Sequence, residues 1–284
     1  MQELDNSLIL EFENLLSLPA PKGRQKEQVI QDFLETHTEL IPFTNRLNHH
    51  LHFRMILSKF PLGTELTTDY VYITKSSDRW RITLVELETP DKSIFTNNMH
   101  AATPSAEFSA ALNQVRNWQI FIDDHKQEVV RKLDPLLRPL VMRNNPIEFN
   151  YQLIIGRSDN KNISEARKKL INKLNSESNI EILTYDSLIN WYKNDQKFKK
   201  NILSLAGFGF KFKYMHFEPA QIFAHVGPDF LFLTAEEKSE LRSAGYEIDK
   251  WSEGELLIAN IKYARSTLEK EMSDEATLKM LNKK

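Results

Sequence analysis

Residues 67–88 read as two strand-like stretches joined by a short polar turn, and this pattern constrains the fold more than any other part of the chain. The segment TTDYVYITKSSDRWRITLVELE predicts a β-hairpin. Its first strand carries one acid, Asp69, and its second strand ends in two, Glu86 and Glu88. Side chains alternate between the two faces of a strand, so Glu86 and Glu88 are expected to project from the same face.

The chemistry of these three acids points to a divalent metal. Carboxylates that converge at strand ends form a hard-oxygen site, the kind that Mg²⁺ or Mn²⁺ occupies. One acid on a strand, then a turn, then an acid-x-acid or acid-x-Lys pair on the partner strand is typical of a metal-dependent phosphodiesterase. The alternative is a solvated hairpin edge, because acidic residues are mostly exposed.

The order of the remaining elements favours an α/β fold. Residues 1–18 and 25–40 show helical spacing of apolar residues, and a long helix is expected from Ser105 to about Leu133. FNYQLIIG and IEILTYD read as strands that alternate with the helices SEARKKLINKLN and SLINWYK. Such alternation predicts a sheet covered by helices. Beyond residue 200 the pattern changes, which predicts a C-terminal α+β extension over 201–284 that ends in a helix from Leu256 onward.

Composition limits the classes of function. The 284 residues carry a formal net charge of −2, so a role in DNA binding must rest on a local basic patch. No apolar run approaches twenty residues, which predicts no membrane partner. The chain contains no cysteine and its first residues lack a basic n-region, which together fit a cytoplasmic protein.

Several motifs, in order, make the chain resemble the Shedu anti-phage nuclease family of the PD-(D/E)XK superfamily. They are EQVIQDFLETHTELI, TDYVYI, LVELETPDKSIFT, ALNQVRNW, LIIGR and ILTYDSLINWY, and they span roughly residues 25–195. The resemblance implies a restriction-endonuclease-like mixed β-sheet flanked by helices, with Mg²⁺ or Mn²⁺ as cofactor and DNA as substrate. It also implies cleavage of phosphodiester bonds in phage defence. The domain division becomes 1–24 for an N-terminal helix and linker, 25–200 for the nuclease domain, and 201–284 for the extension.

The resemblance also assigns roles to individual residues. Asp69 and Glu86 stand at the two acidic positions of the motif, and Glu88 stands where most of the superfamily has Lys. Gln114 lies on the helix that follows the hairpin, where it is expected to contact phosphate or water. Glu27 is a possible further metal ligand, although an acid at this place can also simply stabilise the start of a helix.

Two residues depart from the superfamily pattern. Thr68 replaces the usual Pro, which shapes the backbone and does no chemistry. Glu88 cannot stabilise developing negative charge as Lys does, but it can bind metal or accept a proton. Lys92, four residues on, could supply the missing cation. The alternative function is therefore a nuclease-fold module that binds DNA or a phage component without cutting.

Basic residues provide candidate DNA contacts. Lysines concentrate between Lys193 and Lys213 among aromatic residues, which fits either a track for the phosphate backbone or a solvated surface. Arg157 follows a core strand, a position that fits either an approach to the site or a structural ion pair. The predicted DNA contacts are Lys92, Arg157, Lys199, Lys200, Lys211 and Lys213.

A homo-oligomer is also expected, because double-strand cleavage is served most simply by two sites related by symmetry. The aromatic stripe Phe208, Phe210, Phe212 and Tyr214 needs a covering surface, either a partner or the chain's own core.

Overall fold

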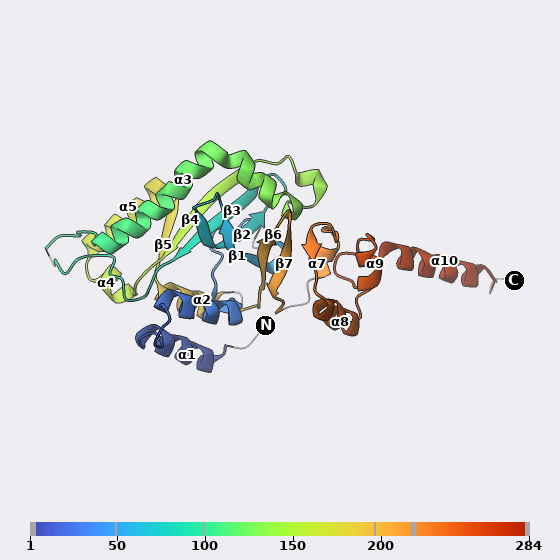
Figure 1. Cartoon of the computed structure of the whole chain (residues 1–284), viewed down its shortest axis with the longest axis horizontal. Coiled ribbons are helices and arrows are strands. Elements are labelled where there is room, and N and C mark those ends of the chain that lie inside the picture. The colour runs from blue at the N-terminus through green and yellow to red at the C-terminus, as the bar shows by residue number, and fades with distance from the viewer. Residues whose placement is uncertain (1–3, 49, 99, 196, 217–219, 282–284) are drawn as a thin grey trace.

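A single eight-stranded mixed sheet forms the centre of the molecule (Figure 1). The computed structural model describes residues 4–48, 50–98, 100–195, 197–216 and 220–281. The strand order is β5-β4-β3-β2-β1-β6-β7-β8. The strands are β1 (Met55–Pro61), β2 (Thr67–Lys75), β3 (Trp80–Leu87), β4 (Ile147–Ile154), β5 (Ile180–Leu183), β6 (Asn201–Ala206), β7 (Gly209–Tyr214) and β8 (Leu231–Phe232).

The hairpin predicted over residues 67–88 is confirmed as β2 and β3, which pair antiparallel. Its alternating side chains serve two separate hydrophobic clusters. Val71 and Ile73 point into one cluster, whereas Tyr70 and Tyr72 point into the other. Both faces of the hairpin are therefore buried, which explains the continuous apolar run from Tyr70 to Ile73 in the middle of β2.

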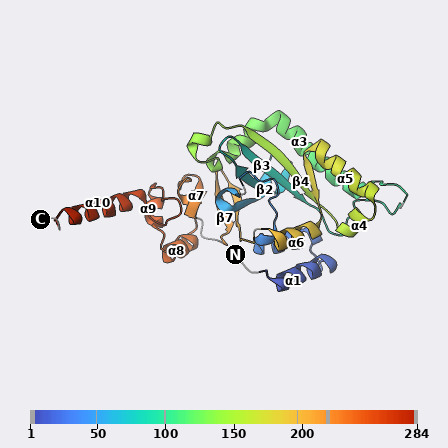
Figure 2. The same ribbon diagram turned by 180° about the vertical axis from the view of Figure 1, so that it is seen from behind.

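Helices cover both faces of the sheet (Figures 1 and 2). One face carries α3 (Ala106–Leu133) and α5 (Glu165–Ser178). The other face carries α1 (Asn6–Ser17), α2 (Lys26–Thr36) and α6 (Tyr185–Asn194). The expected mixed α/β sheet flanked by helices is thus confirmed in this general form.

The first helix belongs to the body of the molecule. Leu8, Phe12 and Leu16 of α1 are buried in the same cluster as Ile30 and Leu34 of α2. Asp5 begins α1 by accepting hydrogen bonds from the backbone N–H groups of the first turn. Residues 1–3 of the predicted N-terminal segment lie outside the described residues.

The strands after residue 200 extend the same sheet. Asn201 at the start of β6 pairs in parallel with Met55, and β7 then pairs with β6. The boundary predicted at residue 200 therefore falls between α6 and β6, inside one continuous sheet. Of the aromatic stripe predicted here, Phe210 and Phe212 are buried in the core, whereas Phe208 is 91% exposed.

The rest of the extension is a small helical group beside β7. It contains α7 (Ala220–Phe223), α8 (Ala235–Ser243) and α9 (Ile248–Ser252), whose buried residues continue the cluster under α3. The final helix, α10, spans Arg265–Leu281 and projects away from the body (Figures 1 and 2). The predicted start at Leu256 is wrong, because residues 257–264 form a bridged turn instead.

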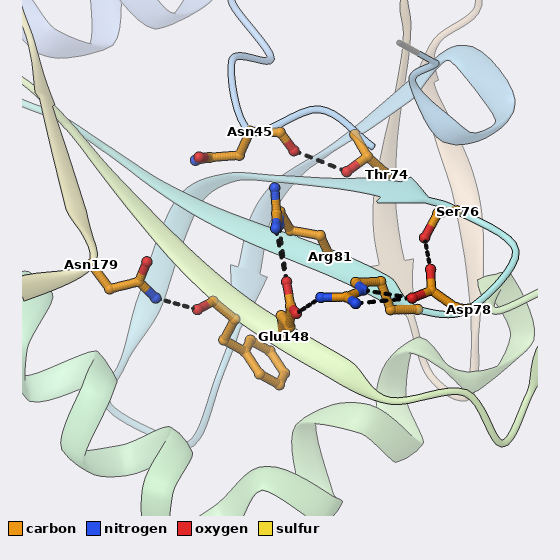
Figure 3. Close-up of polar contacts among 9 residues, drawn as sticks. Asn45, Thr74, Ser76, Asp78, Arg81, Glu148 and Asn179 are labelled. Carbon is orange, nitrogen blue, oxygen red and sulfur yellow. Dashed lines mark hydrogen bonds and ion pairs between the residues drawn. The ribbon is translucent and has the colours of Figure 1, made fainter. Parts of the chain in front are cut away.

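Charged side chains fix the turn end of the hairpin against β4 (Figure 3). Arg81 donates to Glu148, its direct neighbour across the parallel β3–β4 pair, at 2.9 Å. Asn179, in the left-handed region at φ 54°, ends α5 and donates to the Phe149 carbonyl at 2.8 Å. These contacts set the register that carries β3 and β4 toward the opposite end of the sheet.

No helix in the described part of the chain is long and apolar enough to cross a membrane.

Candidate active site at the Asp69 end of the sheet

The predicted acids Asp69 and Glu86 lie on the same face of the hairpin. Tyr70 pairs with Val85, so the register continues with Asp69 directly opposite Glu86. Opposite residues in an antiparallel pair share a face and lie about 5 Å apart. Alternation places both acids on the face covered by α3, and Glu88 continues the same alternation just beyond β3. All three residues are buried, with at most 7% of their surface exposed.

Asp69 is held by two donors. Its Oδ2 accepts the backbone N–H of Leu87 at 2.7 Å, and its Oδ1 forms an ion pair with the ammonium of Lys59. Lys59 lies on β1 between residues that pair with Tyr70 and Thr68, so it neighbours Asp69 across the strands. Its backbone is in the left-handed region at φ 49°, which is uncommon outside glycine and marks local strain.

Lys59 is the site residue that sequence reasoning missed. Burial alone would lower the pKa of its ammonium, but the charges of Asp69, Glu27 and Glu86 outweigh burial and raise it. It therefore brings a fixed positive charge to the acid cluster, and its side chain remains 49% exposed.

Glu86 is the most perturbed acid of the cluster. Burial raises its pKa far above the usual range, and the nearby charges of Asp69, Glu88 and Glu27 raise it further. The amide of Gln114, on α3, donates to Glu86 Oε1. The structure thus brings the predicted residues Asp69, Glu86 and Gln114 together at one place.

Glu88 lies at the rim of the same cluster. Its carboxylate forms an ion pair with Lys92, the lysine predicted as a substitute cation. Its backbone carbonyl accepts the hydroxyl of Tyr185 at 2.5 Å. Burial raises the pKa of this tyrosine well above its ordinary value, and the carboxylates of the cluster add to the effect.

Glu27 reaches the cluster from α2, on the other side of the sheet. Burial and the charge of Asp69 raise the pKa of its carboxyl, and Lys59 opposes them. Four acids therefore share one electrostatic environment with two lysines. Carboxylates that are crowded together and partly buried have strongly shifted pKa values, and groups with such pKa values cluster at functional sites.

The donor chemistry suits a divalent cation, but the side chains are committed to other partners. Asp69 binds Lys59, Glu88 binds Lys92, and Glu86 binds Gln114. Among the described residues, no three acids or histidines are arranged to hold an ion together. The surplus negative charge that raises the pKa of Glu86 is nevertheless what a divalent cation would offset. Asp69, Glu86 and Glu88 therefore fit a metal by chemistry, and they would have to exchange lysine contacts for metal contacts.

Two predicted DNA contacts lie next to the acids. Lys92 and Arg157 line a cavity of about 380 Å³ that also includes Asp159 and Asn160. Arg157 makes a two-pronged ion pair with Asp186 at the start of α6, with distances of 2.8 to 3.2 Å. This pairing supports the structural alternative for Arg157 and leaves about a third of its side chain exposed.

Lys200 does not lie on the surface, and its prediction as a DNA contact is wrong. The residue is fully buried, and its ammonium donates to the Thr38 carbonyl at 2.7 Å. The rings of Phe43 and Phe198 flank this ammonium, and burial lowers its pKa to about 7. A lysine held in this way cannot reach a phosphate backbone.

The remaining predicted DNA contacts do not surround the acids. Lys199 lies two positions before the first residue of β6, which pairs with the start of β1 at the end of the sheet opposite Asp69. Lys213 forms an ion pair with the buried Glu35 at 2.5 Å, and Lys211 is exposed on the same strand. Their role in DNA binding stays a prediction.

A comparison with known protein families identifies the family of this chain. The family described as "Shedu protein SduA, C-terminal" matches residues 24–189, more than half of the chain. The chain belongs to the Shedu family. Membership implies a role in anti-phage defence, and the matched range contains Glu27, Lys59, Asp69, Glu86, Glu88, Lys92 and Gln114. A search of curated proteins found no match.

Proposed function

We propose that this Shedu protein is a metal-dependent DNA endonuclease with a site of the PD-(D/E)XK type. The observation that carries the proposal is the pair of facing acids Asp69 and Glu86, buried at the hairpin end. A partly buried cluster of like charges is costly for folding, so its presence favours a functional role. Mg²⁺ or Mn²⁺ is the proposed cofactor, with Asp69, Glu86 and Glu88 as the residues that would hold it.

When bound, the ion would act as a Lewis acid that stabilises the negative charge developing on the phosphate. Glu88 accepts the proton of the attacking water in this proposal. Because Glu88 lies at the rim beside Lys92, it can meet a water on the open side of the cluster. Gln114 orients Glu86 through its amide hydrogen bond.

Lys59 takes the role that the superfamily assigns to the Lys at the position of Glu88. Its ammonium is anchored at Asp69 and stays half-exposed, so it can turn toward a bound phosphate. Positive charge aimed at developing negative charge in a partly dry site commonly contributes 10²–10³-fold in rate. The lysine of this site would thus come from the neighbouring strand β1, while the acid-x-acid pair stays on β3.

The test is a nicking assay on supercoiled DNA with Mg²⁺ or Mn²⁺, comparing the wild type with Glu86→Gln. The substitution keeps the shape of the side chain and an acceptor for Gln114, and it removes the charge that a cation needs. We expect metal-dependent nicking by the wild type and a loss of at least about 100-fold in the variant. Glu128→Gln, on the exposed side of α3, is the matched control and should nick normally.

One observation favours the second candidate, a module that binds DNA without cutting it. Asp69 and Glu88 are each paired with a lysine, so the charges within the cluster are already partly neutralised. DNA binding by wild type and Glu86→Gln alike, with no nicking at any metal concentration, would support this candidate and exclude the nuclease.

A further inference from the structure

A second polar site lies at the other end of the sheet, where strands β1 and β6 begin. A cavity of about 640 Å³ opens there between the sheet and the C-terminal helical group. Its walls come from the segment that leads into β1, from the end of β2, and from α7. Its lining includes Phe53, Arg54, Lys75, Phe198, Gln221 and His225.

The cavity is basic. Arg54, Lys75 and His225 contribute to its walls, and none of the described lining residues is acidic. Lys75 donates to the Arg138 carbonyl at 2.8 Å, and burial lowers the pKa of its ammonium. Burial also lowers the pKa of His225, and the positive charges of Lys75 and Arg138 lower it further. The charges of Lys75 and Arg138 therefore disfavour a proton on His225, and a bound anion would offset that effect.

The backbone holds one of these cations in a strained position. Phe53 and Arg54 are consecutive residues in the left-handed region, at φ 52° and 49°. Such strain persists only where the surrounding structure fixes it, and it is found mostly at functional sites. The turn directs Arg54 over the ring of Phe198, with its guanidinium carbon 5.3 Å from the ring centre.

The rest of the cavity suits a planar, partly apolar body. Phe53, Phe198 and Leu51 supply ring and methyl surface, and Gln221 supplies an amide that can donate and accept. The volume falls within the range of roughly 300–1,000 Å³ that small-ligand sites occupy. A ligand with an anionic phosphate at one end and a planar ring at the other matches both parts of the wall.

We propose that this cavity binds a phosphorylated small molecule of mononucleotide size, in contact with both the sheet and the C-terminal helical group. Its phosphate would lie against Arg54, Lys75 and His225, and its ring against the apolar part of the cavity wall. The site is separate from the acid cluster. Lys75 lies six positions beyond Asp69 along β2, a span of about 20 Å.

Isothermal titration calorimetry on the full chain in EDTA tests the proposal, with AMP, ATP, inorganic phosphate and adenosine as probes. EDTA keeps metal–nucleotide complexes away from the acid cluster. We expect AMP or ATP to bind with one site per chain, and adenosine to bind at least about tenfold more weakly because it lacks the charge. Binding of adenosine as tight as that of AMP, or no binding by any phosphorylated probe, would overturn the proposal.

Single substitutions in the cavity wall test where the nucleotide binds, and they should leave the fold intact. Gln221→Glu adds one negative charge to an exposed wall residue and should weaken nucleotide binding about tenfold. Gln127→Glu, on the exposed face of α3, is its matched control and should leave binding unchanged. His225→Gln should weaken binding as a second, independent change, whereas Glu86→Gln should not.

A DNA duplex is the competing ligand. If a duplex binds to the wild type in EDTA and loses affinity in Gln221→Glu, while no mononucleotide binds, the basic end is a nucleic-acid surface and the proposal is wrong. Unchanged nucleotide affinity in both Gln221→Glu and His225→Gln would also reject this cavity as the site.

Discussion

The two ends of the central sheet carry opposite chemistry on the same strands. At one end, Asp69 and Glu86 stand face to face and two lysines each pair with one acid. At the other end, Arg54, Lys75 and His225 line a cavity with no acid among its described lining residues. The acid end therefore combines charges of both signs, whereas the described lining of the cavity at the basic end carries only basic side chains as charged groups. We propose that the acid end performs chemistry and that the basic end recognises a ligand.

The largest expected effect is a difference in nicking activity between a variant at the acid end and a variant at the basic end. Asp69→Asn should reduce metal-dependent nicking at least about 100-fold, because it removes a proposed metal ligand and the anchor of Lys59. Lys75→Gln, at the far end of the same strand, should leave the nicking rate within about threefold. Supercoiled-plasmid nicking measures both, with circular dichroism to confirm folding. Equal losses of nicking rate in the two variants would contradict a functional difference between the two ends of the sheet.

Lys59→Met should lower the nicking rate by about 100-fold, because a cation that stabilises the transition state is lost. The same change frees Asp69 from its ion pair, so Mn²⁺ affinity should rise as the rate falls. Lys59→Arg should recover part of the rate. Calorimetric titration with Mn²⁺ measures the affinity, and the nicking assay measures the rate. A lysine with a purely structural role would not raise the Mn²⁺ affinity while lowering the rate.

The thermal stability of the metal-free protein should depend on pH because the acids of the cluster are crowded together. The folded-state pKa of Glu86 lies above its unfolded value, so its contribution to stability is complete below about pH 4.3 and is lost as pH rises toward the folded pKa. Glu86→Gln stays neutral throughout. Its Tm should therefore exceed that of the wild type by about 3 °C or more at pH 8, and the gap should shrink at pH 5.

The control for this stability experiment is Glu128→Gln, an exposed acid paired with Lys132. Surface changes of this kind usually alter stability by less than about 0.5 kcal/mol, so its Tm should hardly move. Adding Mg²⁺ at pH 8 should raise the Tm of the wild type and leave that of Glu86→Gln unchanged. A variant no more stable than the wild type at pH 8 would show that Glu86 carries no unfavourable charge.

The smallest expected effect concerns single DNA contacts at the two ends. Lys92→Gln should reduce the slope of log affinity against log salt concentration by about 0.9, the share of one phosphate contact. Lys199→Gln lies at the opposite end and should leave the slope unchanged if DNA crosses only the acid end. Fluorescence anisotropy with a labelled duplex measures both slopes. An equal change for Lys199→Gln would extend the DNA track along the sheet, as the lysine-rich sequence predicts.

The sequence predicted the parts of the site that follow strict alternation. The hairpin over 67–88 and the shared face of Glu86 and Glu88 depend only on strand periodicity, whereas Gln114 was assigned through the resemblance to the Shedu family. Lys59 could not be found in this way, because its position opposite Asp69 depends on the pairing of a third strand. A positive charge one residue before Phe60 in LHFRMILSKF was the only signal.

Burial was harder to predict for polar residues than for apolar ones. Lysines are almost never fully buried, so the run from Lys193 to Lys213 gave no sign that Lys200 lies beneath Phe43 and Phe198. Likewise, the change of character at residue 200 suggested a separate region, whereas β6 returns to pair with β1. Both outcomes depend on contacts between residues far apart in the chain, which local patterns do not contain.

The pairing of β6 with β1 has a consequence for how the protein is made. During synthesis, β1 to β4 can leave the ribosome and pair long before residues 201–206 are translated. Until then, one edge of β1 has free backbone donors and acceptors that other nascent chains can pair with. A gene truncated at residue 200 would make that exposed edge permanent. Such a fragment should collect in inclusion bodies even though it contains every acid of the candidate site.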